Sequence, residues 1–166
     1  MSDHILNIKD IEYQDWEHGD RFKAQLGEVS SRVGATQLGY NVTVLAPGKR
    51  AFPFHCHRVN EEMFFILEGA GEIRIGPDTY PVTKGDIIAC PAGGPDTAHQ
   101  LINTFEDEEM KFLAVGTSMS PEIAEYPDSK KVGVLAKFSA TGDGKPTVMR
   151  YIIRGQAEMA DYWVGE

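Results

Sequence analysis

Short apolar or alternating segments, separated by turn signals, fill the middle of the chain from about residue 38 to residue 117. The turn signals lie at 47–48, 68–71, 76–78, 84–86, 91–97 and 106–109. Strands of this length with regular turns are typical of antiparallel sandwiches and barrels. No helical period runs long enough to suggest strand–helix–strand units. We therefore predict an all-β antiparallel fold.

The two ends of the chain depart from this pattern. Residues 1–37 are interpreted as an N-terminal arm, in which 5–16 is either an edge strand or a lead-in. Residues 117–166 are interpreted as a C-terminal extension. There Ser120 as N-cap, Pro121 at the first helical position and Glu122 in the first turn predict a short helix. The segments 130–138 and 147–155 are candidates for two further strands.

Composition limits the classes of function. The 166 residues suit one domain, so we predict a single domain over 1–166 with at most one or two short helices. The net charge of −9 argues against a nucleic-acid or anionic-membrane surface, which needs clustered cations. The first residues are too charged for a secretory signal, and no apolar run has membrane-spanning length. Cys56 and Cys90 are expected to be free buried thiols, and the protein to be cytoplasmic.

The stretch PFHCHRVNEEMFFILEG, residues 53–69, carries candidate metal ligands. His55 and His57 are two residues apart, so on a strand they share a face. After a turn at 58–60, we expect the chain to return as an adjacent antiparallel strand. That strand would bring one glutamate, Glu61 or Glu62, opposite the two histidines. Periodicity does not choose between the two glutamates, because both faces of that strand are apolar. Imidazole and carboxylate ligands suit one divalent ion such as zinc, manganese, iron or nickel.

Residues beside the two histidines and farther along the chain add a fourth ligand candidate and an outward apolar face. His99, which opens the strand-like run HQLINTF, is the best candidate for a fourth ligand. Cys56 alternates away from the histidines, and Phe52 and Phe54 share its outward face. Exposed phenylalanines need a cover, which is the N-terminal arm, the C-terminal segment or a second subunit. We therefore predict a homodimer.

At this point the sequence resembles the cupin superfamily. The first cupin motif matches Gly48, His55, His57, Glu62 and Gly69, and the second matches Gly85, Pro91, Gly93, His99 and Asn103. The resemblance covers about residues 38–116 and departs from the family twice. The gap from Gly48 to His55 is one residue longer than usual, and the gap from Gly93 to His99 is three residues longer.

The resemblance implies a cupin-type antiparallel jelly-roll barrel whose core is about 38–116. The spacing of six residues to Gly69 selects Glu62 over Glu61. The implied metal ligands are therefore His55, His57, Glu62 and His99, around one ion per subunit. The whole chain is also similar to small stand-alone cupins classed as sugar-phosphate isomerases.

Three functions are compatible with these ligands. The first is a metal-dependent isomerase acting on a small polar substrate, such as a sugar phosphate, chelated to the ion. The second is a metal-dependent dioxygenase of a small organic acid or thiol, and the third is a non-catalytic small-ligand-binding module. Candidate substrate-binding residues, whose turns or strands adjoin the motifs, are Lys49, Arg50, Tyr40 and Gln100. The catalytic residue that transfers the proton is not assigned.

Overall fold

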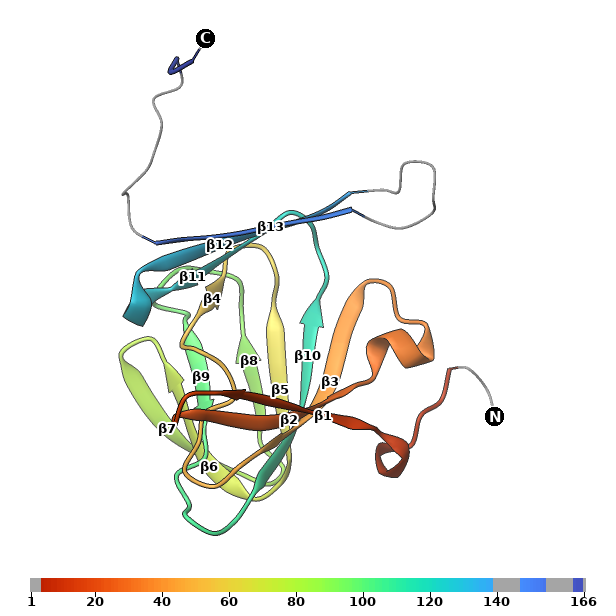
Figure 1. Cartoon of the computed structure of the whole chain (residues 1–166). Helices are drawn as coiled ribbons and strands as arrows, with labels where there is room; N and C mark the ends of the chain where they lie inside the picture. Colours follow the sequence, from red (N-terminus) through yellow and green to blue (C-terminus); the bar gives the residue numbers. More distant parts are fainter. Residues whose placement is uncertain (1–3, 139–146, 155–162, 166) are drawn as a thin grey trace.

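The computed structural model describes residues 4–138, 147–154 and 163–165 (Figure 1). Its elements are η1(Ile8–Asp10), β1(Tyr13–His18), β2(Phe22–Glu28), η2(Ser30–Val33), β3(Leu38–Leu45), β4(Cys56–His57), β5(Glu62–Glu68), β6(Ala70–Ile75), β7(Asp78–Thr83), β8(Ile87–Cys90), β9(His99–Ile102), β10(Met110–Thr117), β11(Glu122–Tyr126), η3(Pro127–Ser129), β12(Lys131–Phe138) and β13(Thr147–Arg154). All strand pairs within the sheets are antiparallel. The predicted all-β jelly-roll barrel is confirmed.

Two sheets make the barrel wall. One has the strand order β1-β2-β3-β10-β5-β8, and the other has the order β7-β6-β9. The N-terminal arm supplies β1 and β2, so it widens the larger sheet with β1 as an edge strand. No helix among the described residues is long and apolar enough to cross a membrane.

The core lies between these sheets and follows strand alternation. Ile66 pairs with Phe112, Phe64 with Ala114 and Glu62 with Gly116, so these residues share the inward face. Phe112, Leu45, Ile66, Ile73 and Met110 are almost completely buried there. Burying five large side chains contributes roughly 1.5–3 kcal/mol each, which makes this cluster the main stabilising element.

Two motif residues have structural roles in the barrel. Gly69, at the turn from β5 to β6, has φ +78°, and a Cβ there would collide with the carbonyl oxygen of Glu109. The buried Asn103 donates to the carbonyls of Leu45 and Glu108, and its own oxygen accepts from the backbone amide of Phe105. These polar contacts satisfy backbone groups where the chain leaves β9.

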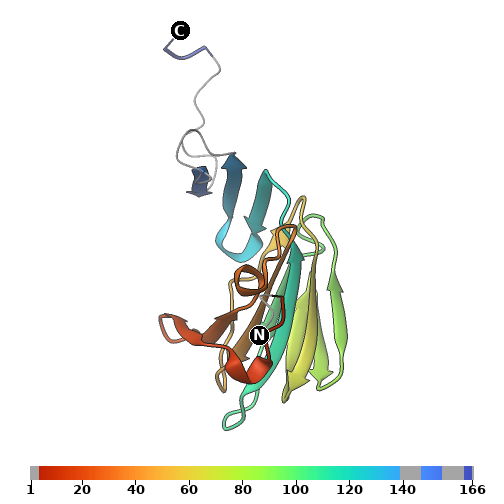
Figure 2. The ribbon, with the colours of Figure 1, turned by 90° about the vertical axis from the view of Figure 1, so that its right-hand side faces the viewer.

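The C-terminal extension forms a third layer. The strands β13, β12 and β11 pair in that order, and β11 pairs with β4, so the layer is joined to the barrel through the histidine strand. In Figures 1 and 2 this layer lies at one end of the barrel. The predicted strands after residue 130 are confirmed as β12 and β13 within the described residues.

The short helix predicted from Ser120 is wrong, because Glu122–Tyr126 is strand β11. The capping residues are compatible with a helix, but β11 is held by ladders on both sides, to β12 and to β4. Pairing on two edges outweighs a local capping preference of about 1 kcal/mol. The described residues contain only 3-10 turns as helical elements.

The chain itself covers the apolar residues around the histidines. Phe52 packs against the main core and lies 5.8 Å, between ring centroids, from Trp16 of the N-terminal arm. It therefore does not share the environment of Phe54 and Cys56, which form a separate buried cluster with Ala98. Strand alternation fails at Phe52 because residues 51–55 are irregular backbone. This surface thus needs no second subunit as its cover, and the homodimer stays a prediction.

Candidate metal site

Four side chains converge inside the barrel. His55, His57, Glu62 and His99 each offer one ligand atom, and these atoms all lie within 4.8 Å of one another. His57 lies on β4 and His99 on β9, while His55 forms an isolated antiparallel bridge to His99. Such a cluster is capable of holding a metal ion.

Glu62 reaches the cluster from the opposite sheet. The predicted neighbouring of the histidine and glutamate strands is wrong, because β5 pairs with β10 and β8 while β4 pairs with β11. Both edges of β5 are therefore occupied, and Glu62 approaches the histidines across the barrel interior. Glu61 is exposed, and its backbone amide donates to Thr117 Oγ1 at 3.0 Å. Strand alternation and register thus decide which of the two glutamates faces inward.

An oxygen atom lies near Nδ1 of each of the three imidazoles. His55 Nδ1 lies 2.8 Å from the carbonyl oxygen of Pro53, and His99 Nδ1 lies 3.3 Å from that of Thr97. Carbonyl oxygens only accept, so Nδ1 carries the proton in the neutral ring of His55, and its Nε2 has a free lone pair. His99 faces an acceptor at both nitrogens, the carbonyl of Thr97 at Nδ1 and Glu62 at Nε2. His57 Nδ1 lies 3.6 Å from Glu122 Oε2. This arrangement orients ring nitrogens for ligation, since metal-binding histidines commonly have an acceptor at their other nitrogen.

The unsatisfied atoms of His57 fit a metal ion. Its Nε2 lies 3.6 Å from Glu62 Oε2, beyond hydrogen-bond distance, and both of its ring nitrogens are buried without a hydrogen-bond partner. His99 Nε2 lies 3.0 Å from the same oxygen of Glu62. A cation among these atoms would give the orphaned nitrogen a partner, and three nitrogens with one carboxylate suit a borderline divalent ion.

Protonation in the cluster follows burial and charge. Burial and the neighbouring His99 lower the pKa of His55 to about 4, so this ring is neutral near pH 7. Burial lowers the pKa of His57, but Glu62 and Glu122 outweigh it and the net direction is upward. Burial alone would raise the pKa of Glu62, yet the imidazoles of His57 and His99 hold it well below its usual range. Glu62 is therefore an anionic carboxylate, the form that binds cations.

Both cysteines lie outside the ligand set. They are free and buried, as predicted. Cys90 pairs with Glu62 across the sheet, and burial together with the Glu62 charge raises the pKa of its thiol to about 12. The thiol therefore stays protonated, and it is a poor ligand beside the imidazoles.

Glu122 is a buried carboxylate that the sequence interpretation missed. Its two oxygens accept from the backbone amides of Val59 at 3.3 Å, Asn60 at 2.9 Å and Ile123 at 2.8 Å. The side-chain amide of Asn60 donates to it as well. These hydrogen bonds fix the carboxylate beside His57, so the C-terminal extension helps to orient a candidate ligand.

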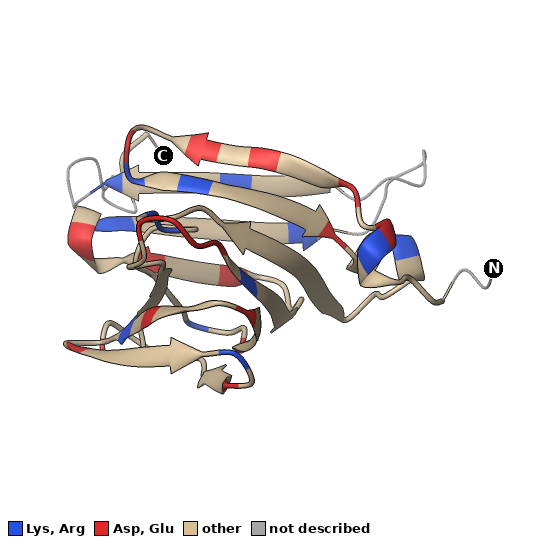
Figure 3. Cartoon of the chain, turned by 90° about the horizontal axis from the view of Figure 1, so that it is seen from below, with Lys and Arg blue, Asp and Glu red and all other residues tan. Residues whose placement is uncertain are grey.

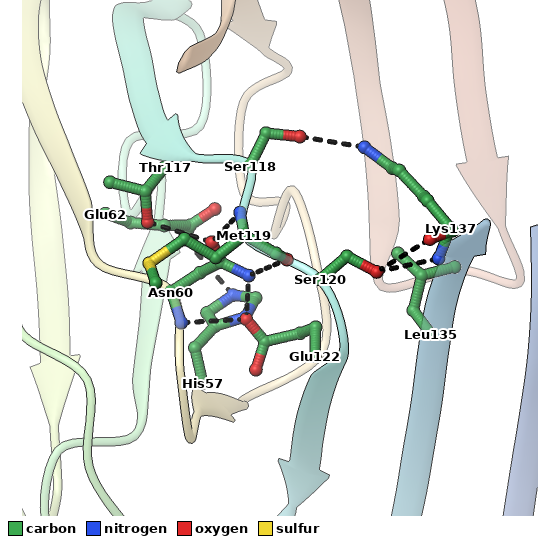
Figure 4. A pocket seen from close by; sticks show the side chains of 10 residues that line it. All are labelled: His57, Asn60, Glu62, Thr117, Ser118, Met119, Ser120, Glu122, Leu135 and Lys137. Carbon is green, nitrogen blue, oxygen red and sulfur yellow. Dashed lines mark hydrogen bonds and ion pairs between the residues drawn. The ribbon is translucent and has the colours of Figure 1, made fainter. Parts of the chain in front are cut away.

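A cavity of about 170 Å³ opens beside the cluster. Figure 4 shows His57 and Glu62 on one side of this cavity. Lys137 lies across from them, next to Ser118 and Ser120. The ammonium of Lys137 donates to Ser118 Oγ at 2.8 Å and is exposed. The lining therefore combines hydroxyl groups and one cation with the candidate ligands.

The four candidate substrate-binding residues lie elsewhere. Arg50 and Gln100 line a different cavity, and Gln100 Nε2 donates to the carbonyl of Phe52 at 2.5 Å. The ammonium of Lys49 donates to the carbonyl of Asp20 at 2.7 Å. Tyr40 pairs with Val115, which places it on the sheet face opposite Glu62. None of the four is among the residues that line the cavity at the cluster.

The inserted loop near His99 also has structural partners. The amide of Gly93 donates to the carbonyl of His57 at 2.7 Å, which ties the start of the loop to the histidine strand. The guanidinium of Arg58 pairs with Glu125 at 2.5 Å. This ion pair therefore links Arg58, in the turn after β4, to strand β11.

The missed residues gave little local signal. Asn60, Lys137 and Glu122 are far apart in the chain, and Glu122 lay in the segment predicted as a helix. One pattern could have indicated Glu122. If residues 122–126 are taken as a strand, Glu122 and Ala124 lie on the same face. This pattern could not be recognised without knowing that β11 pairs with β4.

The family comparison agrees with the jelly roll and the motifs. The model of the cupin domain matches residues 41–116. The matched segment includes all four candidate ligands.

Several known proteins are similar to this chain. It is 26% identical over 122 residues to the polyketide synthase CurC of Streptomyces cyaneus, covering 74% of each protein. It is 31% identical over 75 residues to quercetin 2,3-dioxygenase of Bacillus subtilis, covering 45% of this chain and 22% of the dioxygenase. Among solved structures, a sugar phosphate isomerase of the cupin superfamily from Silicibacter pomeroyi has a TM-score of 0.75 at 24% identity, covering 95% of this chain and 97% of that one. At this identity the structural likeness establishes the shared fold.

Proposed function

We propose that this cupin is a metal-dependent enzyme of the isomerase type, acting on a small sugar or sugar phosphate. The observation that carries the proposal is the cluster of three imidazoles and one carboxylate, within 4.8 Å, beside a cavity that Ser118, Ser120 and Lys137 help to line. A divalent ion held by His55, His57, Glu62 and His99 would supply Lewis-acid polarisation of a substrate oxygen.

The cavity lining supports a small, polar substrate. A volume of about 170 Å³ accommodates the reacting end of a sugar, with the remainder extending outward. Ser118 and Ser120 offer hydroxyl groups for hydrogen bonds, and the exposed Lys137 offers a cation for a phosphate or carboxylate. Lys137 therefore replaces Lys49 and Arg50 as our proposed contact for an anionic group on the substrate. The structural likeness to a sugar phosphate isomerase is compatible with this choice.

One observation favours a dioxygenase as the second candidate. An isomerase needs a group that removes a proton, and the carboxylates among the described lining residues are already engaged. Glu62 contacts two imidazoles, and Glu122 accepts hydrogen bonds from three backbone amides. The 31% identity to quercetin 2,3-dioxygenase also supports this candidate, in which the same four ligands would serve.

Metal analysis followed by two assays separates the candidates. The purified protein should contain about one divalent ion per chain. Incorporation of solvent deuterium into a sugar phosphate, without oxygen uptake, supports the isomerase. Oxygen uptake with an organic acid or thiol, together with bound iron, supports the dioxygenase. A ligand that raises the melting temperature but is recovered unchanged would indicate a non-catalytic binding module.

Two matched variants test the site itself. His57→Ala should lose both metal and turnover, whereas Glu61→Ala, which changes an exposed neighbour of the cluster, should retain both. If His57→Ala retains full metal content, the proposed ligand set is wrong.

We also propose a cytoplasmic homodimer. Within the described residues β13 pairs only with β12, and Tyr151, Ile152 and Ile153 on it are each more than half exposed. An open edge strand with apolar side chains favours pairing with the same strand of a second copy. The mass in solution tests this: Ile152→Lys should convert a dimer to a monomer, and a monomeric parent protein would contradict the proposal.

A further inference from the structure

A second and larger cavity lies outside the barrel wall that carries the metal cluster. Its volume is about 480 Å³, and Gln100 and Ile102 of β9 line it. Their neighbours on the same strand face the other way, since His99 belongs to the cluster and Leu101 to the main core. Strand alternation therefore places this cavity and the metal cluster on opposite faces of β9.

Cationic side chains outnumber acidic ones in the lining of this outer cavity. Arg21, Arg50, Arg74 and Lys131 line it, against the single carboxylate of Asp128. The chain as a whole has a net charge of −9, and acidic and basic residues are interspersed along its strands (Figure 3). Four cations from distant parts of the sequence therefore gather in an otherwise acidic protein. Mutual repulsion disfavours such a group unless an anion is bound among them.

The partners of these cations are unequal. Arg74 pairs with Asp128 at 2.8 Å, and its guanidinium lies 3.6 Å from the centre of the Phe54 ring. Lys131 lies 5.3 Å from the ring centre of Tyr126. The Nε atom of Arg50, in contrast, is buried without a hydrogen-bond partner. A buried donor without an acceptor is unfavourable, and an acceptor on a ligand would remove that cost.

The rest of the lining indicates the type of ligand. Guanidinium groups bind phosphate and carboxylate through paired, planar hydrogen bonds. The rings of Phe22 and Phe54 and the side chain of Ile102 provide apolar surface in the same cavity. The volume also lies in the range of small-molecule sites and exceeds that of a bare oxyanion. We propose that this outer cavity binds a small organic anion bearing a phosphate or carboxylate group, with Arg50 as its central contact.

This anion site is separate from the proposed catalytic site, and the test uses that separation. Inorganic phosphate and succinate are titrated calorimetrically into the full chain and into Glu62→Ala, which lacks the cluster carboxylate. At least one anion should bind saturably with a Kd below about 1 mM, and equally well to both proteins. The stronger of the two identifies the anionic group. Anion binding that disappears in a folded Glu62→Ala would assign it to the metal site and overturn the proposal.

Charge variants identify the residue. Arg50→Gln should weaken the binding at least about tenfold, as expected for loss of a charged hydrogen bond, and leave the metal content unchanged. Lys49→Gln is the matched control, because Lys49 is the adjacent cation but is outside the cavity lining. If Arg50→Gln does not fold, the exposed Arg21→Gln gives the same comparison with a loss of about threefold. Absence of saturable binding, or equal weakening by Lys49→Gln, overturns the proposal.

Discussion

The two faces of strand β9 present opposite chemistry. On the inner face, His99 lies 3.0 Å from Glu62 in a cluster where an anionic carboxylate and imidazoles partner one another. On the outer face, Gln100 and Ile102 border a cavity with four cations and one carboxylate. The inner face thus carries the donor atoms for a cation, whereas the outer face carries an excess of positive charge. One four-residue strand can separate two such environments because successive side chains point to opposite sides of the sheet.

The two faces also differ in what they contribute to folding. Leu101 is buried in the main core, while Ile102 is half-buried at the outer cavity. Removing atoms from a closed core leaves a void, but an open cavity admits water. The inner face should therefore determine stability, and the outer face should tolerate substitution.

The largest expected effect tests this difference in stability. Leu101→Ala should lower the free energy of unfolding by about 3 kcal/mol, because it leaves a void between packed side chains. Ile102→Ala, the matched change on the outer face, should cost about 1 kcal/mol. Urea titration of both variants gives the two values, and equal losses would contradict the contrast between the faces.

Next in size is the loss of the cluster's carboxylate. Glu62→Ala should lower metal affinity by about 100-fold, on the reasoning that a four-ligand site worth about 10–16 kcal/mol shares that free energy among its ligands. Competitive titration with a metallochromic chelator measures the change. Glu61→Ala is the control and should bind metal like the parent protein. A similar affinity in both variants would remove Glu62 from the ligand set.

A smaller effect is expected at the residue that orients His57. Glu122→Gln should weaken metal binding by about tenfold, since outer partners of ligating histidines typically contribute that much. Glu125→Gln, three residues along the same strand, serves as the control because Glu125 pairs with Arg58 instead. Metal affinity and melting temperature are measured together. A fall in melting temperature without a change in affinity would show that Glu122 only holds the turn at Val59 and Asn60.

The smallest effect concerns the space that Glu62 occupies. Gly116 lies opposite Glu62, and a Cβ there would be 3.2 Å from Glu62 Cγ. Gly116→Ala should therefore displace the carboxylate slightly. Metal binding should weaken about threefold, which is about half of the change in binding free energy of a tenfold loss. Gly39→Ala is the matched control, because its Cβ would be 3.9 Å from the nearest atom outside its chain neighbours. Unchanged affinity in Gly116→Ala would mean that Glu62 has room to adjust.

Local signals were sufficient where one strand or turn decides the structure. The turn residues between 47 and 109 predicted the strand-rich barrel, and the motif spacing predicted that Glu62 rather than Glu61 would point inward. The segment at Ser120 shows the limit of this reasoning. Its capping residues favour a helix, but pairing with β12 and β4 made it a strand. A local preference of about 1 kcal/mol cannot predict the outcome when distant partners supply a complete ladder.

The sequence by itself determined the class of fold, because turn positions and alternation are local properties. The four residues that gather in the barrel followed from the resemblance of two sequence motifs to those of the cupins. The tertiary structure decided how they meet. Glu62 crosses from the opposite sheet, Glu122 arrives on a strand from the C-terminal extension, and Arg50 turns toward an outer cavity. Each of these three placements depends on which strands pair with each other, and on which face of β9 the neighbouring segments pack against. Such long-range pairings are set by burial of the whole barrel rather than by any residue's immediate neighbours.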